Sequence, residues 1–186
     1  MIKKVINNFK IGTIWISGLT ASGKTTLGKL LFQDLKKYGI NNIKFLDGDE
    51  LRSLMTKKYG RDLKDRYKIL KEYIKITIKE NKKGNIVIIS TISHKTDMRM
   101  LARREINNFM EVNLECSVRA CSQRDYKGLY SKMKNRSKDF FPGISEPYEF
   151  SESPELIINT ENNSIEFCRK IMFNKAIKHL SFSNNN

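Results

Sequence analysis

The most informative chemistry-bearing segment lies at residues 18–25, GLTASGKT. It fits G-x-x-x-x-G-K-[ST], in which the glycines let a loop turn tightly and direct successive backbone N–H groups at phosphate oxygens. Lys24 supplies a positive charge for the β- and γ-phosphates, and Thr25 supplies a hydroxyl ligand for Mg²⁺. The sequence therefore predicts a nucleotide-binding P-loop for ATP and Mg²⁺, formed by Gly18, Leu19, Thr20, Ala21, Ser22, Gly23, Lys24, Thr25 and Thr26.

Two carboxylates follow the next apolar run, in FLDGDELR at residues 45–52. Ligands of parallel α/β sheets collect at the carboxyl ends of the strands, so Asp47 and Asp49 are expected beside the P-loop. One carboxylate can organise Mg²⁺ through water, and the other can accept the proton of an attacking hydroxyl. Arg52 can hold an anionic acceptor. The alternative is that DGD is only a strand-to-helix turn, with Asp49 as the N-cap of the helix.

The elements that must position these residues alternate along the chain. Short apolar runs rich in β-branched residues, typical of strands buried on both faces, are separated by longer helical patterns. This alternation predicts an α/β fold of three layers with a central parallel sheet flanked by helices, and the motif at residues 18–25 indicates that it is the P-loop NTPase fold. We predict strands at residues 13–17, 43–46, 85–90, 110–114 and 155–159, and helices at residues 25–38, 62–81, 95–108, 117–123 and 164–180.

The segment 124–153 interrupts the alternation. It shows no clear periodicity and contains Pro142 and Pro147, with several aromatic and basic residues. A stretch of this length without regular structure inside a compact domain is usually functional. We therefore predict a lid at about residues 124–153, and a flexible C-terminal tail at about residues 181–186.

Composition indicates one globular domain, because 186 residues are enough for a single full core. No apolar run approaches the roughly 20 residues that a membrane-spanning helix needs. The N-terminal residues lack the apolar region and cleavage site of a signal peptide, so we expect a cytoplasmic protein without a membrane partner. Cys116, Cys121 and Cys168 have no C-x-x-C spacing and indicate neither a zinc site nor a disulfide framework.

The net charge of +15, from 35 Lys and Arg against 20 Asp and Glu, raises nucleic acid as a partner. However, no basic stretch alternates with aromatic residues as a stacking platform for nucleic acid would. A basic surface also suits a phosphate-rich small molecule. We therefore predict a small-molecule nucleotide as the partner and argue against nucleic acid. A nucleic-acid end kinase or binder that uses the same P-loop is the alternative of a different class.

Several blocks of the sequence resemble the adenylyl-sulfate (APS) kinases, which phosphorylate the 3′-hydroxyl of adenylyl sulfate. They are GLTASGKTT, LDGDELR, the pair Asp65-Arg66, ISH at residues 92–94 where the family has ISP, RDYKGLY at 124–130, FPGISEPYE at 141–149 and PELIINT at 154–160. The resemblance implies an ATP-dependent phosphotransferase that acts on an alcohol group. It also implies a single kinase domain over residues 1–186 and favours a homodimer.

The resemblance further implies roles for individual residues. The catalytic groups would be Asp49, Asp47 and Lys24, with Asp49 as the base, and Thr25 and Asp47 would serve the metal. Arg52 and Arg66 would bind the 5′ anionic group of the acceptor. The remaining roles are Arg124 over the ATP base, Lys127 closing the lid onto the phosphates, Arg61, Ile92, Ser93 and His94 at the acceptor, and Phe141 stacked on the acceptor base.

Departures from the family pattern cluster on the acceptor side. Arg61 replaces an aromatic residue that would help to enclose the adenine, Ile69 replaces an asparagine, and His94 replaces a proline. An arginine can stack on a base, but it brings charge and hydrogen-bond donors that favour a carbonyl-rich edge. Some bacterial relatives of the family phosphorylate cytidine diphosphoramidate in capsule biosynthesis instead of adenylyl sulfate in sulfate assimilation. The residues leave both acceptors open.

Overall fold

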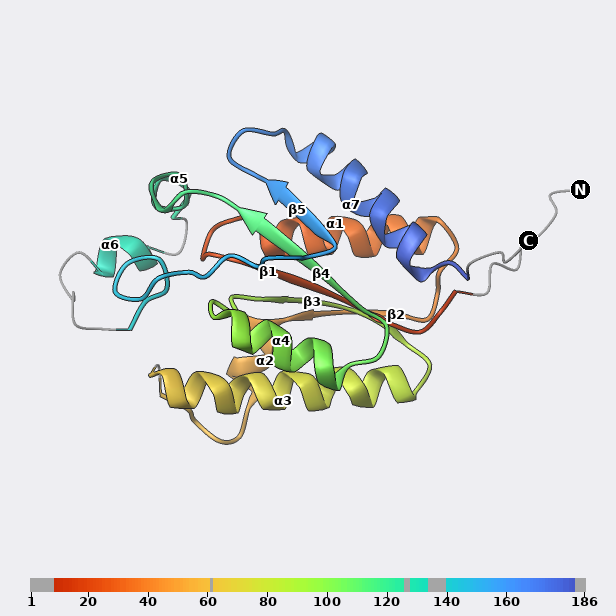
Figure 1. Ribbon diagram of the computed structural model, residues 1–186, viewed down its shortest axis with the longest axis horizontal. Helices are drawn as coiled ribbons and strands as arrows, with labels where there is room; N and C mark the ends of the chain where they lie inside the picture. The colour runs from red at the N-terminus through yellow and green to blue at the C-terminus, as the bar shows by residue number, and fades with distance from the viewer. Residues whose placement is uncertain (1–8, 61, 126–127, 134–139, 183–186) are drawn as a thin grey trace, which may run out of the picture.

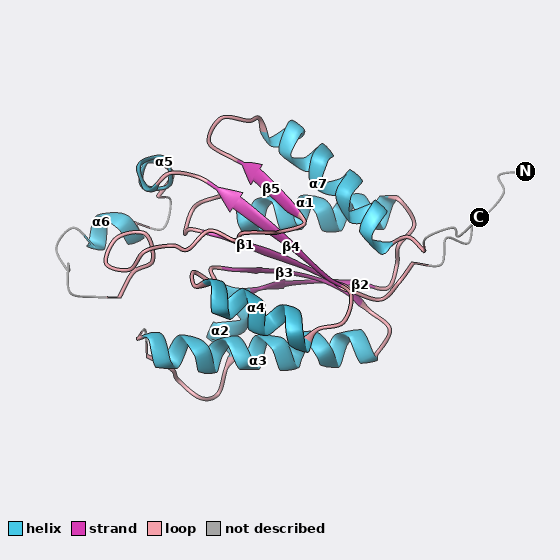
Figure 2. Ribbon diagram, viewed as in Figure 1, coloured by secondary structure: helices cyan, strands magenta, loops and turns pink. Residues whose placement is uncertain are grey.

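The centre of the computed structural model, which describes residues 9–60, 62–125, 128–133 and 140–182, is a parallel sheet (Figure 2). Its strand order is β2-β3-β1-β4-β5, and every neighbouring pair runs parallel. Most strand residues are buried on both faces, as the apolar runs predict. The strands are β1 (Thr13–Gly18), β2 (Ile43–Asp47), β3 (Ile86–Thr91), β4 (Phe109–Glu115) and β5 (Leu156–Asn159).

Helices form a layer on each side of the sheet (Figure 1). One side is covered by α1 (Lys24–Lys37) and α7 (Ile165–Leu180), and the other by α2 (Gly48–Leu54), α3 (Leu63–Lys82) and α4 (Thr96–Glu105). The short helices α5 (Val118–Gln123) and α6 (Leu129–Met133) lie beyond the carboxyl ends of the strands. The prediction of a three-layer α/β fold with a central parallel sheet is confirmed.

Each helical layer has its own apolar core against the sheet. On the α1 and α7 side, Ile14 and Ile16 of β1 pack with leucines of α1 and with Met172 of α7. On the α3 and α4 side, Trp15 is fully buried and its ring lies 5.8 Å from that of Phe109. Alternate residues of β1 therefore join the two cores through one strand, because successive side chains point to opposite faces.

The approach of α1 to the sheet depends on Gly28. A Cβ atom at this position would lie 2.5 Å from the Phe45 ring and 3.3 Å from Ile16. Glycine therefore lets the helix pack closely above β1 and β2, which brings the N-terminus of α1 to the edge of the sheet where the P-loop ends.

The predicted elements are found, with differences at their ends. The helix predicted at 95–108 ends at Glu105, because Ile106 is extended and Asn108 has a φ of +49°, which turns the chain into β4. The strand predicted from 155 begins at Leu156, since the Glu155 carboxylate accepts the backbone N–H of Glu111 at 2.6 Å.

Residues near the two ends of the described chain are joined by backbone hydrogen bonds. Phe9 pairs with Ser181 in an antiparallel bridge, and the Lys10 N–H donates to the Leu180 carbonyl at 2.8 Å. Ser181 and Phe182 thus belong to the described structure, whereas the rest of the predicted tail, 183–186, lies outside the described residues.

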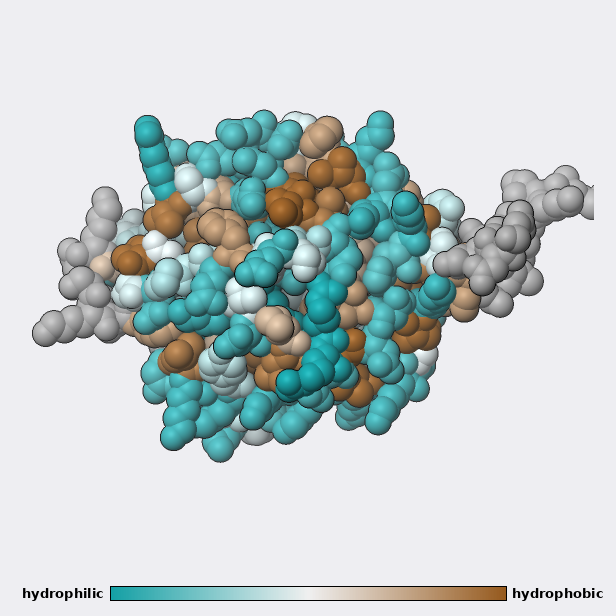
Figure 3. Space-filling view, in the orientation of Figure 1, coloured by the Kyte–Doolittle hydropathy of each residue, from teal (hydrophilic) through white to brown (hydrophobic). Residues whose placement is uncertain are grey.

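The face shown in Figure 3 carries mainly hydrophilic side chains with apolar residues between them. This surface agrees with the charged fraction of 30% in the sequence. Over the described part of the chain, no helix has the length and apolar character of a membrane span.

Candidate active site

A cavity of about 520 Å³ lies at the carboxyl ends of the strands. It is bordered by the loop after β1, the junction of β2 and α2, the loop after β3, and the start of the segment after α5. Residues of α3 and of the start of α7 line it as well, so the structure gathers side chains from distant parts of the sequence. The predicted site residues that line it are Thr20, Ala21, Ser22, Gly23, Lys24, Thr25, Thr26, Asp47, Asp49, Arg52, Arg66, Ile92, Ser93, His94 and Arg124.

The P-loop joins β1 to α1 at one wall of this cavity. Gly23 precedes the helix in the left-handed region, with a φ of +96°, and Ala21 has a φ of +62°. The Lys24 ammonium group donates to the Leu19 carbonyl at 2.6 Å, which holds the side chain across its own loop. This geometry is that of a phosphate-binding loop at a helix N-terminus, where backbone N–H groups and the helix dipole favour anions.

Two hydroxyl groups fix the outer side of the P-loop. The Tyr130 hydroxyl donates to the Thr20 carbonyl at 3.0 Å, and the Thr160 hydroxyl donates to the Ser22 carbonyl at 3.0 Å. Arg124 in turn donates to the Thr160 carbonyl at 2.8 Å. The loop is therefore anchored to α6 and to the end of β5, both of which lie far from it in sequence.

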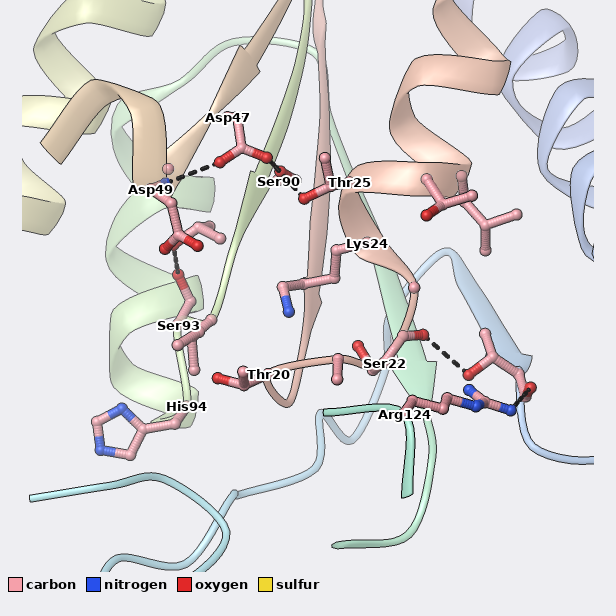
Figure 4. A pocket seen from close by; sticks show the side chains of 18 of the residues that line it. Thr20, Ser22, Lys24, Thr25, Asp47, Asp49, Ser90, Ser93, His94 and Arg124 are labelled. Carbon is pink, nitrogen blue, oxygen red and sulfur yellow. Dashed lines mark hydrogen bonds between the residues drawn. The ribbon is translucent and has the colours of Figure 1, made fainter. Parts of the chain in front are cut away.

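Asp47 connects the P-loop to α2. Its carboxylate accepts hydrogen bonds from the Thr25 hydroxyl at 2.6 Å, from the Ser90 hydroxyl at 3.1 Å and from the Asp49 N–H at 2.9 Å (Figure 4). Burial alone would raise the pKa of Asp47, but the bonds from Thr25, Asp49 and Ser90 outweigh it and lower the pKa below its ordinary value. Asp47 is thus held as a carboxylate beside the Thr25 hydroxyl.

The same bonds make Asp47 the N-cap of α2. The alternative drawn from the sequence, in which Asp49 caps the helix, is therefore wrong. The helix begins two residues earlier because the extended end of β2 places the Asp47 side chain over the first turn. Asp49 lies within that first turn, and its side chain is exposed to the cavity.

Asp49 and Ser93 both line the cavity, and their side chains point toward each other (Figure 4). The backbone of α2 beneath Asp49 is fixed by the Tyr73 hydroxyl, which donates to the Gly48 carbonyl at 2.5 Å. Ser93 has a φ of +38°, which is an uncommon conformation for a residue other than glycine. The acidic group and the serine hydroxyl thus come together from α2 and from the loop after β3.

Two arginines reach the cavity from α2 and α3. Arg52 donates to the Gly60 carbonyl at 2.7 Å and to the Tyr59 carbonyl at 3.2 Å. The Arg66 guanidinium lies 4.6 Å from the centre of the Phe140 ring. Both arginines line the cavity on the side of α2 and α3, so they bring positive charge to this part of the site.

His94 also lines the cavity, and its side chain is almost completely buried, with an exposed fraction of 1%. Its ring meets the edge of the Phe140 ring at a centroid distance of 5.3 Å, and its Nε2 has no hydrogen-bond partner among the described residues. Burial, together with the charges of Arg66 and Lys95, lowers the pKa of His94 to about 4. The imidazole is therefore neutral near pH 7.

The sequence of this chain matches a known protein family. A family model described as adenylylsulphate kinase matches residues 10–159, which is most of the chain. The chain belongs to the adenylyl-sulfate kinase family. The P-loop fold and the family resemblance predicted from the sequence are thereby confirmed, and the family consists of kinases.

Relatives with two different names match at similar identity. An adenylyl-sulfate kinase of Synechococcus sp. (strain JA-3-3Ab) is 34% identical over 167 residues, covering 90% of this chain and 94% of that protein. A cytidine diphosphoramidate kinase of Campylobacter jejuni subsp. jejuni serotype O:2 is 36% identical over 154 residues, covering 82% and 89%. The structure of the Mycobacterium tuberculosis APS kinase in complex with AMPPNP and APS has a TM-score of 0.81 at 29% identity, covering 90% and 98%.

Some residues that the family resemblance points to lie elsewhere. Phe141 is buried in a small cluster with Leu19, Cys121 and Tyr130, and its ring lies 5.0 Å from that of Tyr130. Gly18 and Leu19 belong to the predicted P-loop but are not among the residues that line the cavity. Arg61 and Lys127 lie outside the described residues.

Other residues enter the site without having been predicted from the family motifs. Ser90, Tyr73 and Thr160 line the cavity and hold Asp47, α2 and the P-loop, respectively. Ser90 could have been found from its place at the carboxyl end of a predicted strand, next to that of β2. Phe140, which contacts both Arg66 and His94, lies in the aperiodic segment, where the sequence gives no side-chain direction.

Proposed function

We propose that this protein transfers the γ-phosphoryl group of ATP to the 3′-hydroxyl of a 5′-activated nucleotide, with adenylyl sulfate as the first candidate acceptor. The observation that carries the proposal is one cavity that is lined by the P-loop, by Asp47 and Asp49, and by Arg52 and Arg66. The names of the relatives, adenylyl-sulfate kinase above all, support the same reaction.

Magnesium is the metal that the residues at this site suit. The Thr25 hydroxyl and the Asp47 carboxylate are hard oxygen donors 2.6 Å apart. No group of three or more His, Cys, Asp or Glu that could hold a metal ion occurs among the described residues. This donor set fits Mg²⁺, which keeps several waters and binds through few protein oxygens together with phosphates. When bound, the ion would neutralise charge on the β- and γ-phosphates.

The protein contributes positioning, charge and a base. Phosphoryl transfer needs little covalent help, so that orientation and electrostatic stabilisation supply most of the rate. Lys24 and the N–H groups of the P-loop would hold the phosphates of ATP, and Arg124 would lie near its base. Asp49 would accept the proton of the attacking hydroxyl, a role supported by its exposure to the cavity and by its direction toward Ser93 (Figure 4).

The anionic end of the acceptor would be bound by Arg52 and Arg66. An arginine can donate to phosphate or sulfate oxygens through two parallel N–H groups, which fixes the orientation of the anion. Ile92, Ser93 and His94 would contact the nucleoside. Phe141 and Lys127, whose family roles are stacking and lid closure, stay predictions.

Cytidine diphosphoramidate is the second candidate acceptor. The observation that favours it is that Ile69 and His94, which depart from the family pattern, both line the cavity on the acceptor side. The phosphate side keeps the family pattern, and the Campylobacter jejuni relative is named a cytidine diphosphoramidate kinase. A kinase that keeps the reaction but uses a different nucleotide would be expected to keep the phosphate side of the site and to differ on the acceptor side.

The test is a coupled ATP-consumption assay on a panel of acceptors, with and without Mg²⁺. The panel holds adenylyl sulfate, cytidine diphosphoramidate, plain nucleotides and a DNA oligonucleotide. We expect turnover that requires Mg²⁺ and one of the first two acceptors, with little ATP hydrolysis alone. Lys24→Ala is the control for activity from a contaminating kinase. Phosphorylation of the oligonucleotide alone, or turnover without any acceptor, would show the proposal to be wrong.

A further inference from the structure

Arg99 of α4 lies beneath the loop at residues 92–94, here called the acceptor-side loop. It is almost completely buried, with an exposed fraction of 1%. Its Nη1 donates to the Ser93 carbonyl at 2.6 Å, and its Nη2 donates to the Glu149 carbonyl at 2.5 Å. Its Nε donates to the Ser151 hydroxyl at 2.7 Å. One side chain therefore holds backbone or side-chain atoms of two segments that are more than 50 residues apart in sequence.

The charge of Arg99 is compensated inside the protein. Its Nε lies 3.0 Å from the carboxylate of Glu111, which is itself buried in β4. A buried ion pair contributes little net stability unless its remaining donors are also satisfied. Here the remaining donors of the guanidinium are directed at the acceptor-side loop and at the segment after Pro147, so the pair provides a fixed point for both.

The loop that Arg99 holds has a conformation that needs support. Ser93 has a φ of +38°, in a region that non-glycine residues occupy only when the surrounding structure holds them there. The next carbonyl, that of His94, accepts the Glu149 N–H at 2.8 Å, and the Thr96 N–H donates to the Glu149 carboxylate at 2.8 Å. Arg99 thus completes a set of bonds that lock Ser93 and His94 against the 149–151 segment.

We propose that Arg99 is a positioning residue for the acceptor: it holds the Ser93 carbonyl and the 149–151 segment in register, so that the loop at 92–94 is preformed for acceptor binding. The inference rests on the proposed function for the identity of the acceptor. Arg99 does not line the cavity and makes no described contact with the P-loop. Its loss should therefore affect the acceptor and leave ATP binding unchanged.

The test is Arg99→Lys, compared with Arg103→Lys one turn later on α4. Lysine keeps the positive charge beside Glu111 but cannot donate in three fixed directions. Arg103 also lies near Glu111, at 3.4 Å, and pairs with Glu155, but no described bond joins it to the 92–94 loop. We expect Arg99→Lys to raise the KM for the acceptor between about ten- and a hundred-fold, with the KM for ATP unchanged. Arg103→Lys should change neither.

If Arg99→Lys does not fold, the double variant Arg99→Gln/Glu111→Gln removes both buried charges together and is expected to show the same selective rise. An unchanged acceptor KM in a folded variant, or an equal rise in both KM values, would overturn the proposal.

Amide hydrogen exchange separates this inference from the proposed function, because it needs no turnover. In Arg99→Lys we expect the Glu149 amide to exchange at least about tenfold faster than in the wild type and in Arg103→Lys. If the acceptor panel fails but this exchange changes as expected, the reaction is wrong and the positioning role stands. Unchanged exchange overturns the positioning role whatever the acceptor is.

Discussion

Two carboxylates that are separated by a single glycine have different surroundings in this protein. Asp47 is nearly buried, caps α2 and accepts the Thr25 and Ser90 hydroxyls. Asp49, in the first turn of the same helix, is exposed to the cavity. A buried carboxylate close to one that is exposed to the cavity suits a division between metal support and proton acceptance.

This division predicts the effect of Asp49→Asn. The amide cannot accept the proton of the attacking hydroxyl, so we expect the turnover rate to fall by about 10²- to 10⁴-fold. The affinity for AMPPNP, measured by calorimetry, should be unchanged because the P-loop and Asp47 are intact. Glu50→Gln is the matched control: it removes the neighbouring acidic charge on the same turn, outside the cavity lining, and should keep full activity. A fully active Asp49→Asn enzyme would contradict the assignment of the base.

The sequence predicts the residues of this site to different extents. The P-loop and the two aspartates could be placed because each follows an apolar run that had to be a strand, and strand ends share one edge of the sheet. Arg99 could not be found, because a helix pattern gives no reason for burying an arginine until Glu111 is placed opposite it. Nor could the sequence tell that Phe140 contacts Arg66 while Phe141 packs beneath the P-loop.

The helix that follows the P-loop is positioned by its packing on the sheet. The absence of a side chain at Gly28 allows α1 to lie directly on Phe45 and Ile16. Because α1 carries Lys24 and Thr25 in its first turn, its distance from the sheet also sets the position of these two residues relative to Asp47.

Gly28→Val should therefore destabilise the protein. The added side chain overlaps the Phe45 ring, and overpacking of this kind typically costs about 1 to 3 kcal/mol. Lys29→Val is the matched control, since it introduces the same β-branched residue at an exposed position of the same helix. Urea unfolding monitored by circular dichroism gives the two free energies of unfolding. Equal losses in the two variants would show that the close approach at Gly28 contributes nothing.

The interiors of the elements were predictable from the sequence, whereas several of their ends were not. Strand interiors such as residues 86–90 are continuous apolar runs, which only a strand buried on both faces explains. Ends depend on single tertiary contacts: Glu155 binds the backbone of β4 instead of extending β5. The short helix α6 had no periodic signal, because a helix of five residues makes little more than one turn.

At the scale of the whole molecule, stability should depend on pH through His94. The groups facing its ring region are Arg66, Lys95, Arg99 and Glu149, and burial with the nearby positive charges lowers the pKa from 6.5 to about 4. Between these values the unfolded chain binds a proton that the folded protein does not. The free energy of unfolding therefore decreases as the pH falls from 6.5 toward 4.

His94→Gln removes this dependence and keeps a neutral polar side chain. Relative to the variant, we expect the wild type to lose about 2 kcal/mol of stability between pH 7 and pH 5. Urea unfolding of both proteins at the two pH values measures the difference. The same change in both proteins would mean that His94 does not titrate in this range differently from the unfolded chain.

The tryptophan at position 15 is the only one in the sequence, and it is fully buried against Phe109 on the α3 and α4 side of the sheet. An indole in such a dry environment emits at short wavelength, and its emission moves to longer wavelength once water reaches it. Since β1 leads directly into the P-loop, the molecule carries an intrinsic optical reporter in the strand that supports its phosphate site. The shift of its fluorescence emission on unfolding can be followed without any added label.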